Sequence, residues 1–199
     1  MKTKPILTVF LAIMAGLILL GILFRDQVMY ILNQPALHSH ALFIHIAAVT
    51  LFFANAVIGI IWESRALASC RKEVILHTYT TVSYLDARLS SPLIVVSVVS
   101  GIMLSAIWGN MMETGWLFWS FILFLVSGLL WVLTDISTQR KVKNLMNTLN
   151  PAEDSLPAEL IRLLKLRLWV GIADVSPLLI VFIFMVYKPY IPVPVFFMP

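Results

Sequence analysis

Five long apolar segments separated by polar loops dominate the pattern of the chain. They cover residues 5–24, 41–62, 92–108, 115–134 and 168–187. Each is close to the ~20 apolar residues that an α-helix needs to cross the ~30 Å hydrocarbon core of a bilayer. Lipid offers no partner for backbone polar groups, so such segments cross it as helices. The pattern predicts an all-α protein, a single bundle of five transmembrane helices over residues 1–199.

The composition supports a membrane protein and excludes some other classes. Of the 199 residues, 60% are hydrophobic and 12% are charged, whereas soluble domains carry about 25% charged residues. The connecting loops leave no room for a separate soluble domain. The net charge of +4 is explained by membrane topology, and no feature of the sequence favours a nucleic-acid partner. The single cysteine, Cys70, excludes an intramolecular disulfide and a cluster of thiolate ligands.

The basic residues fall almost entirely in alternate loops between the predicted spans, and therefore on one side of the membrane. If the first helix begins in the cytoplasm, only Arg25 and Lys188 of the fourteen Lys and Arg residues lie outside. This asymmetry predicts a cytoplasmic N-terminus and an external C-terminus. The first apolar run is longer than the core of a secretory signal, and no small-residue cleavage site follows it. We therefore expect it to be a retained span.

The two cytoplasmic segments, residues 63–91 and 135–167, are expected to be partly helical. The first lacks Gly and Pro, so its second half is expected to continue directly into the third span. Pro92 would then lie inside that helix, where it removes one backbone hydrogen bond and bends the axis. Residues 157–167 form a short basic helix whose charges would lie against the anionic inner leaflet.

His45 is the only histidine within a predicted span, and it shares a helix face with small residues and with Glu63. A histidine inside a membrane span is a candidate functional residue. It would bind a haem iron or a copper ion, or relay a proton. The alternative is an interhelical hydrogen bond. No second span carries a histidine, so a haem would need Lys or Met as its other ligand.

His38 and His40 precede His45 on the outer side. Three imidazoles within eight residues would suit a copper or zinc site. Because no carboxylate or sulfur ligand stands beside them in the sequence, the alternative is that these histidines simply occupy an interfacial loop.

A second polar cluster is expected near the inner ends of the spans. It comprises Glu63, Asp86, Arg88, Asp135 and Asp174. Asp174 lies inside the fifth span, where a carboxylate must be paired, protonated or hydrated. Arg88 is at a suitable depth to pair with it and tie the third span to the fifth. The alternative is that the cluster forms one end of a proton or cation path.

Three stretches resemble an uncharacterised family of bacterial inner-membrane proteins, the domain of unknown function 2269. They are the run from His45 to Asn55, the run from Asp86 to Pro92 that leads to Ser100-Gly101, and the closing Met185-Val186-Tyr187-Lys188-Pro189. The resemblance covers roughly residues 41–189, and it implies a location in the bacterial inner (cytoplasmic) membrane.

The context of His45 is also weakly similar to that of copper-resistance D proteins and the membrane protoporphyrinogen oxidase. That similarity implies haem binding through His45 alone, since no other residue carries over.

Three functions stay open at this stage. The first is a redox-linked role with haem or copper at His45. The second is a small proton-coupled or ion-coupled transporter, or an accessory subunit, that uses the inner polar cluster. The third is a structural membrane protein that joins a partner or a second copy of itself. No nucleotide-binding loop, zinc signature or nucleophile–base motif is present in the sequence, so hydrolytic enzyme activity is not expected.

Overall fold

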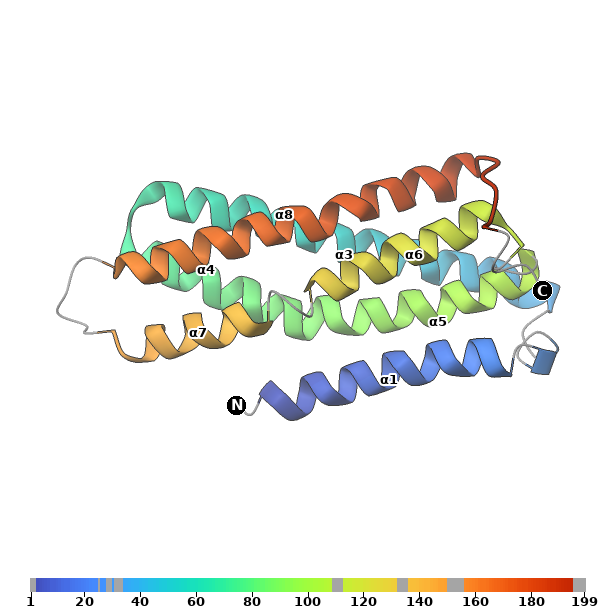
Figure 1. The fold of residues 1–199 in the computed structure, drawn as a ribbon, viewed down its shortest axis with the longest axis horizontal. Coiled ribbons are helices and arrows are strands. Elements are labelled where there is room, and N and C mark those ends of the chain that lie inside the picture. The colour runs from blue at the N-terminus through green and yellow to red at the C-terminus, as the bar shows by residue number, and fades with distance from the viewer. Residues whose placement is uncertain are drawn as a thin grey trace.

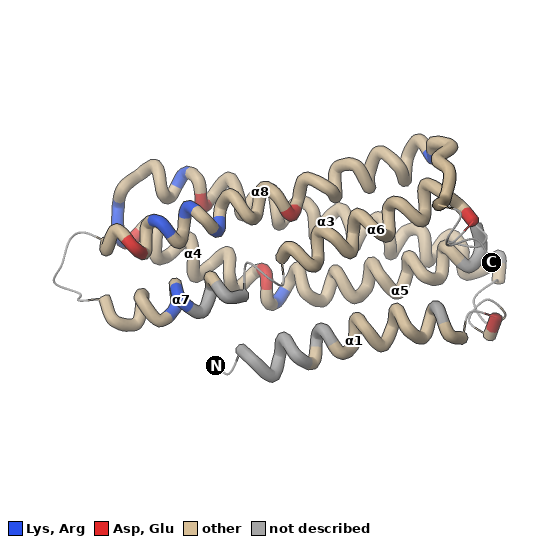
Figure 2. The backbone as a smooth tube through the Cα atoms, viewed as in Figure 1, with Lys and Arg blue, Asp and Glu red and all other residues tan. Residues whose placement is uncertain are grey.

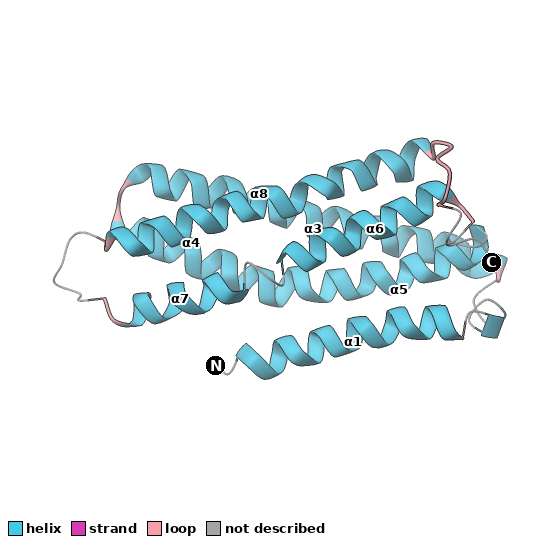
Figure 3. Ribbon diagram, viewed as in Figure 1, coloured by secondary structure: helices cyan, strands magenta, loops and turns pink. Residues whose placement is uncertain are grey.

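The structure is a computed structural model that describes residues 3–24, 26–27, 30, 34–108, 113–131, 136–149 and 156–194. Its helices run side by side along the long axis of an elongated bundle, and α1 lies next to α5 (Figure 1). The described residues form helices and loops without any strand (Figure 3). The predicted all-α class is therefore confirmed.

The helices follow one another along the chain with short connections. Their bounds are α1 Thr3–Leu23, α3 Pro35–Ser69, α4 Lys72–Leu85, the π-helix η1 Asp86–Ser90, α5 Ser91–Trp108, α6 Gly115–Leu130, α7 Ile136–Asn147 and α8 Ala158–Tyr187.

Three helical stretches are long and apolar enough to cross a membrane: Ala36–Ser69, Lys72–Ser105 and Ala158–Tyr187. Two shorter apolar helices, Ala12–Gly21 and Gly115–Leu130, accompany them within the described residues. A helix of 34 residues is about 51 Å long, well beyond the ~30 Å hydrocarbon core, so the long helices must project from the membrane. Five spans and the orientation of the chain stay predictions.

Two helices are longer than their apolar runs predicted. The second apolar run, residues 41–62, lies within α3, which begins at Pro35, ends at Ser69 and is capped by Cys70 in the left-handed conformation (φ 52°). Proline suits the first turn of a helix, since its missing N–H has no intrahelical acceptor there. The fifth run, residues 168–187, is likewise extended back to Ala158. The end of the predicted fourth span, residues 132–134, lies outside the described residues.

The end of the bundle where α4, α7 and the start of α8 meet has a hydrophobic core of its own. Val142 of α7 and Leu160 of α8 are fully buried there, and they pack with Ile75 and Tyr79 of α4. The lysines and arginines of the described chain gather mainly around this end (Figure 2). We refer to it as the basic end.

At the opposite end, the C-terminal tail folds back over the start of α6. The indole N–H of Trp119 donates to the carbonyl oxygen of Pro192 at 3.2 Å. The ammonium of Lys188 lies 5.6 Å from the ring centroid of Trp116. A Cβ at Gly115 would overlap the carbonyl oxygen of Ile191, so glycine permits this close approach.

Candidate functional site

Arg167 of α8 is the centre of a buried ion-pair cluster. Its Nη2 lies 3.2 Å from Oδ2 of Asp86 and 3.5 Å from Oε1 of Glu63. Its Nη1 donates to Ser83 Oγ at 3.2 Å, and the guanidinium carbon lies 4.7 Å from the ring centroid of Tyr79. Arg167 is only 7% exposed. One side chain of α8 therefore joins α3, α4 and η1.

The π-helix places one carboxylate of this cluster. Asp86 is the first residue of η1, and its carbonyl oxygen accepts hydrogen bonds from the backbone N–H and the Oγ of Ser91. A five-residue turn of this kind changes the angular register between the segments on either side, and such turns are frequent at functional sites. Ser90, at the other end of η1, accepts a hydrogen bond from Asn55 Nδ2 of α3 at 2.9 Å. Both ends of the π-helix are thus fixed to neighbouring helices.

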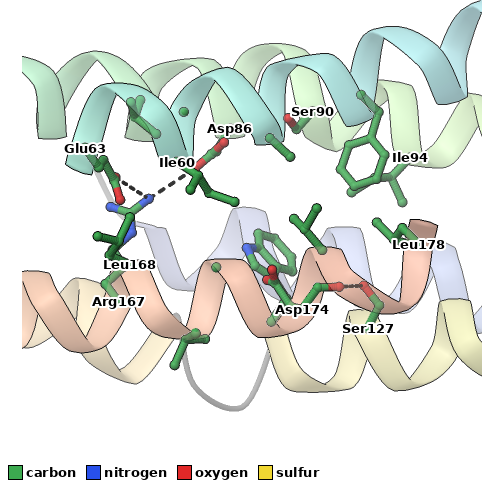
Figure 4. A pocket seen from close by; sticks show the side chains of 18 residues that line it. Ile60, Glu63, Asp86, Ser90, Ile94, Ser127, Arg167, Leu168, Asp174 and Leu178 are labelled. Carbon is green, nitrogen blue, oxygen red and sulfur yellow. Dashed lines mark hydrogen bonds and ion pairs between the residues drawn. The ribbon is translucent and has the colours of Figure 1, made fainter. Parts of the chain in front are cut away.

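A cavity of about 120 Å³ opens between α3, the α4–η1–α5 helix, α6 and α8 (Figure 4). Its polar lining residues are Glu63, Asp86, Ser90, Ser127, Arg167 and Asp174. Most of its remaining lining residues are apolar, and Ile94 and Leu178 lie at the other end of the cavity from Arg167 (Figure 4).

Asp174 lies on the same face of α8 as Arg167, seven residues or about 10 Å further along the helix. It is 8% exposed and lines the cavity. The Oγ of Ser127 on α6 donates to the backbone carbonyl oxygen of Asp174, which ties the two helices together at this point. The cavity therefore holds an ion-pair cluster and a further carboxylate about 10 Å along α8 from Arg167.

His45 lies away from this cavity, between α3 and α5. Its Nδ1 is 2.9 Å from the carbonyl oxygen of Ser97 and 3.1 Å from Oγ of Ser100. A carbonyl oxygen can only accept, so Nδ1 carries the proton and a neutral ring keeps its lone pair on Nε2. A Cβ at Gly101 would lie 3.2 Å from Cε1 of His45, so glycine leaves space for the imidazole.

The structure does not assemble the three outer histidines into a metal site. His40 is exposed, and it lies about 200° around α3 from His38 at 100° per residue. Among the described residues, no three His, Cys, Asp or Glu side chains are arranged to hold a metal ion.

Comparison with known families now adds to this geometry. Residues 40–189 match the family described as "Predicted integral membrane protein (DUF2269)", which is well over half of the chain. The chain belongs to this family. No curated protein and no solved structure matches the chain. The matched region of this DUF2269 member includes most of α3 and all of α4, η1, α5, α6 and α8, which surround the cavity, and it leaves out α1.

Within this DUF2269 protein, three of the five residues of the predicted inner cluster line one cavity. They are Glu63, Asp86 and Asp174. Arg88 is exposed and is not among the lining residues, so the expected pair between Asp174 and Arg88 is wrong. Asp135 lies outside the described residues.

Sequence reasoning missed Arg167, which it counted among the basic residues of a surface helix. A signal was present, because Arg167 continues the buried face of α8 that runs through Leu160, Leu164, Asp174 and Leu178. A charged residue at a core position of an apolar helix indicates a buried partner. In this DUF2269 member, the spacing of the buried residues along α8 would have identified Arg167, rather than Arg88, as the buried cation.

Proposed function

We propose that the protein binds a proton or a small monovalent cation in the central cavity, as a small ion-coupled transporter or an accessory subunit of one. Asp174 is the binding carboxylate. The observation that carries this proposal is the position of Asp174, which is 8% exposed on the cavity wall and about two turns from the ion-pair cluster.

The charges of the cavity support cation binding. Among the described lining residues, three are acidic (Glu63, Asp86 and Asp174) and one is basic (Arg167), so the lining is rich in carboxylates. Ionised carboxylates are costly within a bilayer. Arg167 is held near Glu63 and Asp86 by the contacts described above. Uptake of a proton or a cation at Asp174 would lower the remaining cost.

The placement of the basic end supports a path that begins in the cytoplasm. Under the positive-inside rule, the basic end lies in the cytoplasm of a bacterial cell, and the chain has a cytoplasmic N-terminus and an external C-terminus. Arg167 then lies near the inner surface, and Asp174 lies about 10 Å deeper in the inner membrane. The apolar side chains of Phe52, Ile94 and Leu178 line the cavity as well.

The proposal predicts that Asp174→Asn abolishes proton flux. Protein reconstituted in liposomes with an internal pH-sensitive dye would be driven by a potassium diffusion potential. The parent acidifies or alkalises the interior according to the sign of the potential, whereas Asp174→Asn falls to the rate of protein-free vesicles. Glu159→Gln is the matched control, because Glu159 is exposed on the same helix. Parental flux in a folded Asp174→Asn protein contradicts the proposal.

A second candidate function rests on the hydrogen bond of His45. Histidine ligands of metals commonly donate their other ring N–H to a backbone carbonyl, which fixes the tautomer. The bond from Nδ1 to the carbonyl oxygen of Ser97 leaves Nε2 for a haem iron or a copper ion, which would supply redox chemistry. An absorption spectrum and metal analysis of protein extracted from its native membrane test this role. A haem band or bound copper that disappears in His45→Ala supports it, and colourless, metal-free, folded protein contradicts it.

If neither Asp174→Asn nor His45→Ala changes anything except stability, the protein is a structural partner within the membrane.

A further inference from the structure

We infer that the ion taken up in the central cavity is the proton, and that water held between Asp174 and the ion-pair cluster of Arg167 carries it. Three small residues of α3 and α8, Ala56, Gly59 and Gly171, keep this space open. The inference rests on the proposed role of Asp174 as the binding carboxylate, and it adds which ion is bound and how that ion reaches its site.

The volume and the lining of the cavity suit water. The cavity of about 120 Å³ has room for about four water molecules, since each takes ~30 Å³ in the liquid. A buried water needs about two to four polar partners, and cavities that stay dry are apolar. The wall of this cavity provides carboxylate, guanidinium and hydroxyl groups from Glu63, Asp86, Ser90, Ser127, Arg167 and Asp174 (Figure 4). Water therefore has both room and partners here.

Two contacts define the register between α3 and α8. At the ion-pair cluster, Oε1 of Glu63 lies 3.5 Å from Nη2 of Arg167. One turn further along α8, a Cβ at Gly171 would lie 3.7 Å from Cγ1 of Ile60, which is about one turn earlier in α3. The two helices are therefore antiparallel at the cavity wall.

Small side chains lie along both of these walls. The antiparallel register brings Ala56 of α3 to about the level of Asp174. Between that level and Glu63, the wall includes Gly59 of α3 and Gly171 of α8. Protein interiors are close-packed, with few voids larger than a water molecule. The small side chains therefore account for the open space between the ion-pair cluster and Asp174.

Hydrogen-bonded water can relay a proton to Asp174 without moving any larger group. A water beside Asp174 donates a proton to the carboxylate, forming an O–H bond there, and takes a proton from the next water towards the ion-pair cluster. One proton therefore enters from the side of Glu63 and Asp86 for each proton bound at Asp174. Relays that use acidic side chains occur in membrane pumps and transporters.

The ion-pair cluster favours the proton over a metal ion. A metal ion would have to pass the guanidinium of Arg167, which lies 3.2 Å from Asp86 and 3.5 Å from Glu63. Like charges a few ångströms apart repel strongly where the dielectric constant is low. A proton avoids this repulsion, because it can bind to the carboxylate of Glu63 or Asp86 on its way.

The first test measures hydration of the cavity in the unaltered protein. X-ray pulses split water into hydroxyl radicals that oxidise the adjacent side chains, and mass spectrometry of protein in lipid nanodiscs locates the oxidation. Ile60 lines the cavity, whereas Ile58 is 46% exposed on the opposite side of α3, towards the lipid. We expect Ile60 to be oxidised several times faster than Ile58. Equal rates would overturn the inference.

Ala56→Leu provides a second test that leaves every charge in place, because the larger side chain fills part of the cavity. We expect slower oxidation of Ile60 and a proton flux in liposomes near that of protein-free vesicles. Ala173→Leu is the matched control with parental behaviour, since Ala173 is exposed beside Asp174 and outside the cavity. Parental flux in a folded Ala56→Leu protein would overturn the inference. If Ala56→Leu does not fold, the comparison of Ile60 with Ile58 still decides.

Exchange of the salt tests the identity of the ion. Replacement of all sodium in the liposome assay by choline is expected to leave the proton flux unchanged. A flux that requires sodium would overturn the proton as the ion bound in the cavity.

The inference and the proposed function fail in different ways. If Asp174→Asn abolishes proton flux but Ile60 is oxidised no faster than Ile58, the water path is wrong and proton uptake at Asp174 stands. If Ile60 is oxidised faster but folded Asp174→Asn keeps the parental flux, the proposed role of Asp174 is wrong and the inference falls with it.

Discussion

Arg167→Leu is expected to destabilise the protein by about 3–5 kcal/mol, the usual cost of removing one partner from a buried ion pair. The change leaves the carboxylates of Glu63 and Asp86 facing each other across the position of the lost guanidinium. It also removes the hydrogen bond to Ser83 and the contact with the ring of Tyr79. Thermal unfolding in detergent, followed by the loss of helical circular dichroism, measures the effect.

Arg162→Leu is the matched control, because Arg162 is exposed on the same helix. We expect a change within about 0.5 kcal/mol for that surface substitution. A triple variant that combines Arg167→Leu with Glu63→Leu and Asp86→Leu should recover most of the lost stability, since apolar replacements of buried ion pairs are often neutral. If the Arg167→Leu protein unfolds at the parental temperature, Arg167 does not join the helices as described.

Leu160→Ala is expected to cost about 2–5 kcal/mol, which is typical when a buried leucine is shortened in a core. Leu160 is fully buried at the basic end, where it packs with Val142, Ile75 and Tyr79. The cavity left behind would loosen α7 from α8. We expect a lower unfolding temperature and faster protease cleavage in the connection between α7 and α8.

The control for this change lies on the same helix. Leu166 is 51% exposed, so Leu166→Ala should alter neither the unfolding temperature nor the cleavage rate appreciably. Equal losses for Leu160→Ala and Leu166→Ala would mean that the basic end has no core of its own.

The helical architecture was largely predictable from the sequence. Apolar runs of about 20 residues indicate helices in lipid, because a helix forms all of its backbone hydrogen bonds within one segment, as the absence of water there requires. The ends of the helices were less predictable. Residues 63–69 include Glu63, Arg65 and two serines, and only the absence of glycine and proline indicated that the helix continues to the left-handed turn at Cys70. The helix of residues 157–167 was expected to lead into the fifth span, and the two form the single helix α8.

The site was predictable only in part. Glu63, Asp86 and Asp174 were all expected near the inner ends of their spans, and all three line the cavity. The choice of cation failed because Asp86 and Arg88 are two residues apart and therefore point to roughly opposite sides of their helix. With this geometry Asp86 faces the cluster and Arg88 is exposed, while Arg167 supplies the positive charge.

The most direct test of the central claim is whether Asp174 itself takes up the proton. Infrared difference spectra of the protein in lipid bilayers, recorded between acidic and alkaline pH, detect the carbonyl stretch of a protonated carboxyl group. The account predicts a carboxyl band that gains and loses intensity with pH in the parent and is missing from Asp174→Asn. A folded Asp174→Asn protein with the same difference spectrum as the parent would contradict it.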